Sequence, residues 1–181
     1  MSRFSGLQCR VAESPNSHES VMGLLMDNVG SEFTESRVRG LLGLPKSTTH
    51  RALKELSDQG LVSTTAVGRT LTYRMDADDP LIRHLKIARA IARARAAVAP
   101  LADDVDMAVL FGSGAQGTDS SGSDLDLFVV TSAPDRVLGA LSRHERIQPV
   151  VMTPTQHMQL IAEGGTFARA VADGVPILTS R

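Results

Sequence analysis

Residues 111–130, FGSGAQGTDSSGSDLDLFVV, decide how the second half of this chain folds. They begin at the end of an apolar run, residues 107–111, that predicts a buried strand. A loop of small residues follows, and a second apolar run then alternates Asp124 and Asp126 with leucines. Because side chains alternate across a strand, we expect both carboxylates on one face.

Two carboxylates on one face of an apolar strand require a counter-charge. Mg²⁺ is the simplest one, because it binds through one or two carboxylates and takes its other ligands from water and phosphate oxygens. Gly112 and Ser113 lie where the first strand is expected to turn into a helix, so backbone N–H groups and a hydroxyl can hold a phosphate there. Together, these four residues predict a nucleotide–metal site.

The order Gly-Ser, short loop, Ser-Asp-x-Asp-Leu resembles the signature of the DNA polymerase beta-type nucleotidyltransferases, and most closely the minimal nucleotidyltransferases. The resemblance implies that Gly112 and Ser113 hold the phosphates of an NTP. It also implies that Asp124 and Asp126 bind the catalytic metals, which makes them the candidate catalytic residues. The bland alternative is a glycine-rich turn followed by an edge strand with solvent-facing aspartates.

Two positions depart from the family pattern. The first motif often has an arginine where this chain has Gln116. The family also places a third aspartate on a following strand, where it activates the attacking hydroxyl, and Gln148 stands at that position in the strand expected over 147–152. A neutral amide cannot act as a general base near neutral pH. Glu145 and Asp119 are close in sequence, but their spacing supports neither as a substitute, so the pattern leaves enzymatic activity open.

The charge of the chain is distributed unevenly. The 181 residues can form one large or two small domains, and the net charge is −1. Residues 1–100 hold 14 Lys and Arg against 10 Asp and Glu, whereas residues 101–181 hold 5 against 10. A basic first half favours a polyanion such as DNA. The aromatic content of 3% argues against base-stacking platforms.

The single cysteine, Cys9, excludes an internal disulfide and fits a reducing cytoplasm. No apolar run approaches the ~20 residues of a membrane span, and the chain opens without a signal-peptide pattern. We therefore predict a cytoplasmic protein without a membrane partner. His144 and His157 have no metal-spaced neighbours and are predicted to be surface or packing residues.

Residues 17–77 predict a winged helix-turn-helix. Helices are expected over residues 17–28, 35–42 and 47–59, and two short strands flank a Gly-Arg turn to form the wing. Phe33 is either a short strand or an anchor. The run GLPKSTTHRALKELSDQGLV, residues 43–62, resembles the helix-turn-helix of bacterial winged-helix regulators of the IclR, ArsR and MarR types.

The first turn of the second helix in such a unit normally enters the major groove of double-stranded DNA. The candidate DNA-binding residues are Lys46, Ser47, Thr48, Thr49, His50, Arg51 and Arg69. We expect Thr49 or Arg51 at base edges and Lys46 and Ser47 at phosphates. Arg69 is expected to contact the DNA backbone or the minor groove from the wing. The alternative is the polar face of a small helical domain that binds protein.

An alanine-rich helix is expected from residue 81 to about residue 98. Its apolar stripe is predicted to consist of Leu81, Leu85, Ala88, Ile91, Ala92 and Ala96. The helix is expected to pair with its copy in a homodimer that matches two DNA half-sites, to pack on the chain's own C-terminal domain, or to do both. Further helices are expected over 134–143, 154–162 and 167–172, and a closing strand over 175–178.

We therefore predict an α+β protein with a winged helix-turn-helix over 1–79, a linker helix over 80–99 and a nucleotidyltransferase-like mixed sheet with flanking helices over 100–181. The leading function is DNA-binding transcription regulation, with a second domain that binds a nucleotide and Mg²⁺ as a sensor or as a degenerate enzyme. The alternative is an active Mg²⁺-dependent nucleotidyltransferase that modifies a hydroxyl of a protein, RNA or small molecule. A role in a toxin–antitoxin pair is a third hypothesis.

Overall fold

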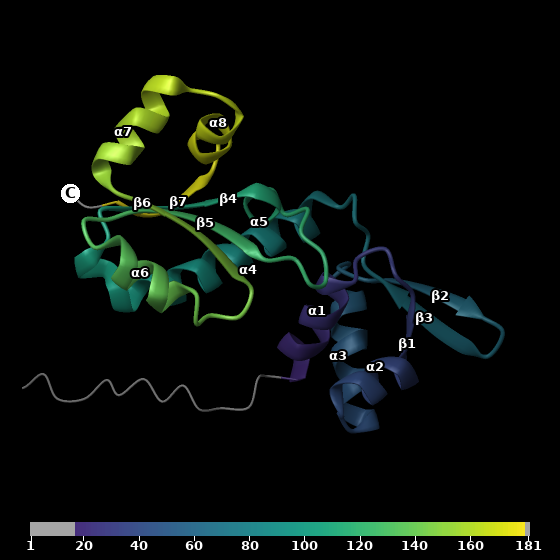
Figure 1. Cartoon of the computed structure of the whole chain (residues 1–181). Helices are drawn as coiled ribbons and strands as arrows, with labels where there is room; N and C mark the ends of the chain where they lie inside the picture. The colour runs from purple at the N-terminus through teal and green to yellow at the C-terminus, as the bar shows by residue number, and fades with distance from the viewer. Residues whose placement is uncertain (1–16, 180–181) are drawn as a thin grey trace, which may run out of the picture. The chain divides into compact units, whose positions relative to one another are not determined.

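The computed structural model describes residues 17–179, so Cys9 lies outside the described part of the chain. The chain divides into two compact units, Met1–Met75 and Asp76–Arg181, and each is described by itself (Figure 1).

The first unit consists of three helices and a small antiparallel sheet, as the sequence predicts for a winged helix-turn-helix. Its elements are α1 (Ser17–Asp27), β1 (Phe33–Thr34), α2 (Glu35–Leu42), α3 (Lys46–Asp58), β2 (Ser63–Val67) and β3 (Thr70–Arg74), with strand order β1-β3-β2. Phe33 is both a strand residue and an anchor, because it pairs with Tyr73 and is 3% exposed.

Local signals in the sequence set the bounds of α2. The Thr34 side chain accepts a hydrogen bond from the Arg37 backbone N–H at 3.2 Å, which caps the first turn. Gly43 ends the helix in the left-handed conformation, with φ 64°, which glycine adopts without strain. Pro45 then precedes α3 and separates the two helices by a tight turn.

The second unit is a mixed four-stranded sheet with helices on both faces. Its elements are α4 (Pro80–Val98), the 3₁₀ helix η1 (Ala99–Asp104), β4 (Met107–Phe111), α5 (Gly112–Gln116), β5 (Leu125–Val130), α6 (Pro134–Leu141), β6 (Ile147–Met152), α7 (Pro154–Glu163), α8 (Thr166–Ala172) and β7 (Val175–Thr179). The strand order is β6-β5-β4-β7, so β6 and β7 are the edge strands. Only β5 and β6 run parallel; the other pairs are antiparallel.

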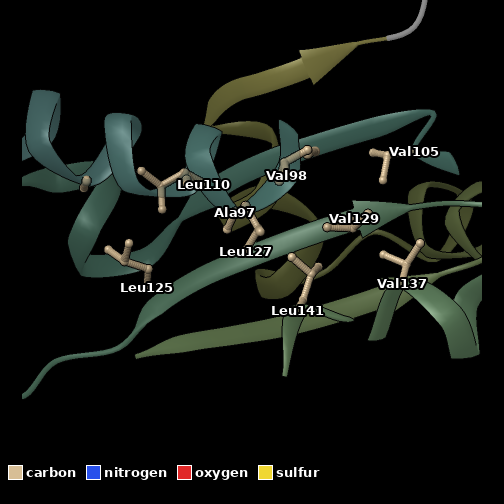
Figure 2. Packing of buried hydrophobic residues seen from close by; sticks show 12 residues of the cluster. Ala97, Val98, Val105, Leu110, Leu125, Leu127, Val129, Val137 and Leu141 are labelled. Carbon is tan, nitrogen blue, oxygen red and sulfur yellow. The ribbon is translucent and has the colours of Figure 1, made fainter. Parts of the chain in front are cut away.

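Alternation along the strands divides the core of this unit into two layers. Leu125, Leu127 and Val129 of β5 pack with α4 and α6 on one face (Figure 2). Phe128 and Val130 of the same strand point to the other face, which α7 and α8 cover (Figure 1). The sheet is therefore buried on both sides, as its nearly continuous apolar strands require.

Helix α4 packs on the sheet of its own unit, which is one of the two arrangements left open by the sequence. The predicted stripe was wrong. The buried face consists of Ile82, Lys86, Ala90, Ala94, Ala97 and Val98, whereas Leu81 is 53% exposed. Of the helices within residues 17–179, none has the length and apolar character needed to cross a membrane.

Candidate functional sites

Asp126 lies on β5 between two strand neighbours in register. Phe111 of β4 pairs with it on one side and Gln148 of β6 on the other. Directly paired residues project from the same face of a sheet. Gln148 therefore stands beside Asp126, on the face where a third acid would be needed.

Gly112 makes room for the Asp126 carboxylate. A Cβ atom at position 112 would lie 2.2 Å from Asp126 Oδ2, and the backbone φ of 67° also favours glycine. Ser113, the next residue of α5, is half-buried. The structure thus brings the start of the Gly-Ser motif into direct contact with the Asp-x-Asp motif, although eleven residues, 113–123, separate Gly112 from Asp124.

The two aspartates form a site with excess negative charge. Asp124 is exposed just before β5 begins, and Asp126 is half-buried. Burial raises the pKa of the Asp126 carboxyl above its ordinary value, and the negative charge of Asp124 raises it further. A cation that offsets both charges would lower the free-energy cost of keeping the two carboxylates ionised side by side.

The two carboxylates of Asp124 and Asp126 suit a Mg²⁺ ion that takes its other ligands from a nucleotide and water. Within residues 17–179 no group of three or more His, Cys, Asp or Glu side chains could hold a metal ion. The protein ligands available are therefore the carboxylates of Asp124 and Asp126. Mg²⁺ is commonly held by one or two carboxylates together with substrate phosphates and water, so the two carboxylates fit an ion that arrives with a nucleotide.

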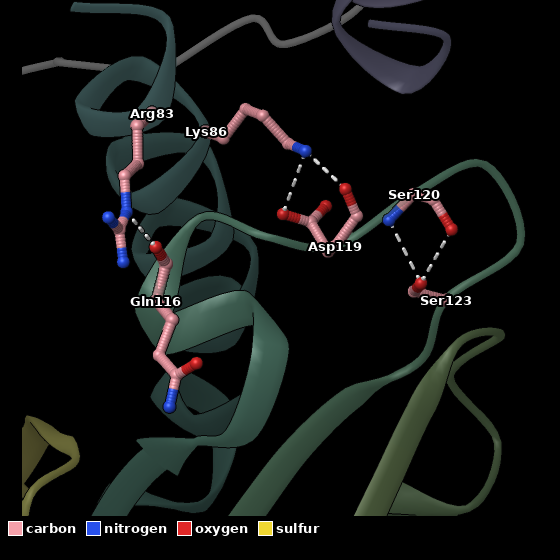
Figure 3. A network of polar contacts seen from close by, with 6 residues as sticks. All are labelled: Arg83, Lys86, Gln116, Asp119, Ser120 and Ser123. Atoms are coloured by element: carbon pink, nitrogen blue, oxygen red, sulfur yellow. Dashed lines mark hydrogen bonds and ion pairs between the residues drawn. The ribbon is translucent and has the colours of Figure 1, made fainter. Parts of the chain in front are cut away.

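The loop between α5 and β5 is fastened to α4 by side chains that the sequence did not single out (Figure 3). Lys86 Nζ donates to the Asp119 carbonyl oxygen and lies 3.5 Å from Asp119 Oδ1, with side-chain exposures of 3% and 12%. Arg83 Nε donates to the Gln116 carbonyl oxygen at 2.7 Å. The Asp119 carboxylate therefore faces a lysine on α4, while Glu145 is exposed.

A signal for Lys86 was present in the sequence. Lys86 is spaced by four residues from Ile82 and from Ala90, and both lie on the buried face of α4. A lysine on such a face requires a partner, because a buried ammonium group without one is costly.

The first unit has a polar cleft of about 640 Å³ between the starts of α2 and α3 and the wing. Three predicted DNA-binding residues, Lys46, His50 and Arg69, line it together. Glu35 also lines it, and Glu35 Oε2 lies 2.9 Å from His50 Nδ1. Sequence reasoning missed Glu35, which follows the helix cap Thr34 and reads as an ordinary first-turn acid.

The other predicted DNA-binding residues on α3 are placed differently from one another. Ser47 and Arg51 are exposed and Thr48 is half-buried. Thr49 is fully buried, at 0% exposure, and its hydroxyl donates to the Pro45 carbonyl oxygen at 3.1 Å. The expectation that Thr49 reads a base edge was therefore wrong, because its side chain packs inside the unit, and Arg51 remains the candidate.

Comparison with known proteins bears on both units. Residues 34–66 match the family model of the IclR helix-turn-helix domain. Residues 97–179 match the model described as Polymerase beta, Nucleotidyltransferase. No curated protein matches the chain significantly.

Two solved structures are similar to parts of the chain. A candidate nucleotidyltransferase from Sulfolobus solfataricus is 18% identical, with a TM-score of 0.39, over 54% of this chain and 86% of that one. NolR from Sinorhizobium fredii is 25% identical, with a TM-score of 0.32, over 51% of this chain and 95% of that one. Because both TM-scores are low, the assignment rests on the two family models alone. This chain joins a helix-turn-helix domain of the IclR type to a nucleotidyltransferase-like domain of the polymerase beta type.

Proposed function

We propose that this protein is a DNA-binding transcription regulator whose C-terminal domain binds a nucleoside triphosphate with Mg²⁺ as a sensor and does not transfer it. The observation that carries this proposal is the register of Gln148 beside Asp126. An amide at that position cannot accept the proton of an attacking hydroxyl. We place this regulator in the cytoplasm and expect it to bind DNA as a homodimer, since such regulators match two half-sites.

The DNA-binding part of the proposal is supported by the cleft of the first unit and the exposed face of α3. Lys46 and Arg69 converge on the cleft from α3 and from the wing, which suits a phosphate of the DNA backbone. Arg51 is exposed on α3, where a guanidinium can donate two hydrogen bonds to a guanine. The phosphate contacts would set the position of the protein and Arg51 would supply sequence preference.

The nucleotide-binding part is supported by the contact between Gly112 and Asp126. The backbone N–H groups at Gly112 and Ser113 would bind phosphate oxygens, and the Ser113 hydroxyl would add a donor. Asp124 and Asp126 would hold Mg²⁺, which when bound neutralises charge on the phosphates. The raised pKa of Asp126 means that lowering the pH would protonate this ligand before an ordinary aspartate and weaken metal binding.

A second candidate function is favoured by a specific observation. The chain has both carboxylates and the close approach of Gly112 to Asp126, and these residues would position a triphosphate. An active nucleotidyltransferase would need its proton acceptor from elsewhere, such as the acceptor substrate or water. Its acceptor would be a hydroxyl of a protein, RNA or small molecule, including the toxin–antitoxin case.

Label transfer distinguishes the two candidates. The full chain is incubated with each α-labelled NTP, Mg²⁺ and a cell lysate, beside the Asp124→Asn/Asp126→Asn variant and an active transferase as positive control. We expect no label transfer by the wild type, but Mg²⁺-dependent NTP binding in equilibrium dialysis that the double variant loses. Label that appears with the wild type and disappears in the double variant would establish the transferase instead.

A Gln148→Asp variant sharpens the experiment. If the amide is what silences the site, this variant gains transfer while retaining NTP binding. If neither protein transfers label and neither binds any NTP, the nucleotide part of the proposal is wrong, while the DNA-binding part stands on its own test.

A further inference from the structure

The face of the sheet that carries Asp126 also carries a cavity of about 280 Å³. Val109 of β4 and Pro176 of β7 form its floor, and α7 and α8 form its walls. These two helices lie together over this face in Figure 1. The proposed function uses none of the residues that line this cavity.

The cavity is lined almost entirely by apolar side chains. Leu160 of α7 and Val171 of α8 face it, and among residues 17–179 His157 of α7 is the single lining residue that carries a polar side chain. Within the part of the chain that the structure describes, no acid, lysine or arginine lines it. This chemistry disfavours a phosphate or another charged ligand and favours an apolar one with one group that can hydrogen-bond to an imidazole.

Small residues keep this space open. Ala168 and Ala172 line the cavity from α8, where a larger apolar residue would fill it. Gly174 closes the end: a Cβ there would lie 2.6 Å from Val109 Cγ1 and 2.7 Å from the Leu110 carbonyl oxygen. Gly174, the residue before β7, therefore lies close to β4, and the exposed Ile161 also lines the cavity.

An aromatic cluster separates the cavity from the carboxylates. Phe128 lies 5.5 Å from the His157 ring and 6.0 Å from Phe167, between ring centroids. Phe167 lies 5.6 Å from Phe111, which pairs in register with Asp126. Val109 is two residues before Phe111, about 7 Å along the strand, so the cavity and Asp126 are neighbours on one face.

We propose that this cavity binds a small, mostly apolar molecule of one or two rings whose single polar group hydrogen-bonds to His157. Its size supports this ligand class. An engineered cavity of about 150 Å³ accepts benzene, and pockets for drug-sized ligands begin at about 300 Å³. A volume between those limits suits a ligand of one or two rings. Such a ligand would act as an effector that is separate from the triphosphate site.

The test is a fluorescence titration of the full chain with 2-naphthol. The chain has no Trp and one Tyr, so little intrinsic emission interferes. Ala168→Leu fills the cavity, and Ala170→Leu adds the same side chain at an exposed position of the same helix. We expect saturable binding of one 2-naphthol per chain, an affinity at least tenfold lower in Ala168→Leu, and unchanged affinity in Ala170→Leu. Thermal melting of both variants establishes that they are folded.

Two further measurements make the result specific. His157→Phe keeps a ring against Phe128 but removes the polar group, so 2-naphthol should bind this variant no better than naphthalene does. Mg²⁺ with ATP should not compete with 2-naphthol. The proposal is overturned by non-saturable binding to the wild type, by equal affinity in the two leucine variants, or by competition with ATP. Competition would mean that the cavity is the base pocket of the nucleotide site.

Discussion

The loop between α5 and β5 has an aspartate near each end, and the surroundings of the two differ. Asp119 faces the buried ammonium group of Lys86 on α4. Asp124 faces another carboxylate, Asp126, and among the described residues neither of these two forms an ion pair. Asp119 is paired with a lysine of its own chain and fastens the loop, whereas Asp124 and Asp126 are the carboxylates that we propose to bind Mg²⁺.

The first unit contains an intermediate case. Glu35 lies in the cleft that we propose to bind DNA, its Oε2 is 2.9 Å from His50 Nδ1, and both side chains are partly open to solvent. An exposed pair of this kind contributes little to stability. We expect this pair to influence DNA affinity, through the charge of the cleft, more than folding.

Removing Lys86, the partner of Asp119, should have the largest effect on stability. Lys86→Met leaves Asp119 buried without its cation, and we expect the free energy of unfolding to fall by about 3 kcal/mol. Urea denaturation measures it. Arg83→Met, which removes an exposed hydrogen bond to the same region, should cost under about 1 kcal/mol. Equal costs for the two variants would mean that the Lys86–Asp119 pair does not stabilise the loop, and Lys86→Met/Asp119→Asn should recover part of the loss.

Adding a side chain at Gly112, beside Asp126, should have the next largest effect. Gly112→Ala places a Cβ against Asp126 Oδ2 and strains a positive φ, so we expect a loss of about 2–3 kcal/mol and of Mg²⁺-dependent NTP binding. Gly122→Ala, also at positive φ but with nothing within 4 Å, isolates the strain and should cost about 1 kcal/mol. Thermal unfolding and equilibrium dialysis measure the two effects. NTP binding by Gly112→Ala at wild-type affinity would contradict the site.

Base contact by α3 is expected to be worth about 1–3 kcal/mol. Arg51→Ala should weaken operator binding by that amount and relax sequence preference. Lys54→Ala is the matched control on the same helix, because Lys54 is already paired with Asp58 at 2.6 Å. A gel-shift titration compares them. If Arg51→Ala and Lys54→Ala lower affinity equally for operator and random DNA, then Arg51 does not read a base.

Removing the negative charge of Asp126, which lies near that of Asp124, should stabilise the protein. The pKa of Asp126 is higher in the folded state than in the unfolded chain, so its ionised form disfavours folding above the unfolded pKa. Asp126→Asn should therefore raise the free energy of unfolding at pH 7, by up to about 1 kcal/mol for a partly solvated group. The gain should shrink as the pH falls through the folded pKa towards the unfolded value. Thermal melts between pH 4 and pH 7 follow it, and a gain that grows on acidification would have the wrong sign.

The smallest effect is expected in the cleft that we propose to bind DNA. Glu35→Gln removes a negative charge beside Lys46 and Arg69, so DNA affinity should rise by two- to fivefold, about 0.4–1 kcal/mol. The salt dependence of binding, measured by fluorescence anisotropy, should show the gain mainly at low salt. Ser36→Ala, another residue of the cleft, should leave affinity unchanged.

The elements were predictable from sequence largely because their ends carry strong signals. Thr34 and Thr153 cap α2 and α7 through their hydroxyls, and Gly43 stops α2. The alternation of Asp124 and Asp126 with leucines located the acidic site, and strand pairing placed Gln148 opposite Asp126 as the motif order predicts.

Two predictions were wrong: which face of α4 is buried, and that Thr49 is exposed. On α4 the predicted stripe included the larger residues Leu81 and Leu85, whereas the buried face contains a lysine and three alanines beside Ile82 and Val98. The two faces differ by one residue, a rotation of about 100°. Alanine is only weakly hydrophobic, so it gives little indication of which face of a helix is buried. Lys86 within the buried face made that face still harder to recognise. The prediction for Thr49 was wrong for another reason. Its hydroxyl donates to the Pro45 carbonyl oxygen, so this polar side chain can be buried in the core.

The two edge strands of the C-terminal sheet share a feature that bears on assembly. β6 contains Pro149 and β7 contains Pro176, and a proline has no N–H to donate. Prolines on edge strands discourage the addition of a further strand from another molecule, and thus protect against aggregation through exposed edges. A homodimer of this protein is therefore expected to form through helices or through the first unit, and not by extending the sheet across two chains.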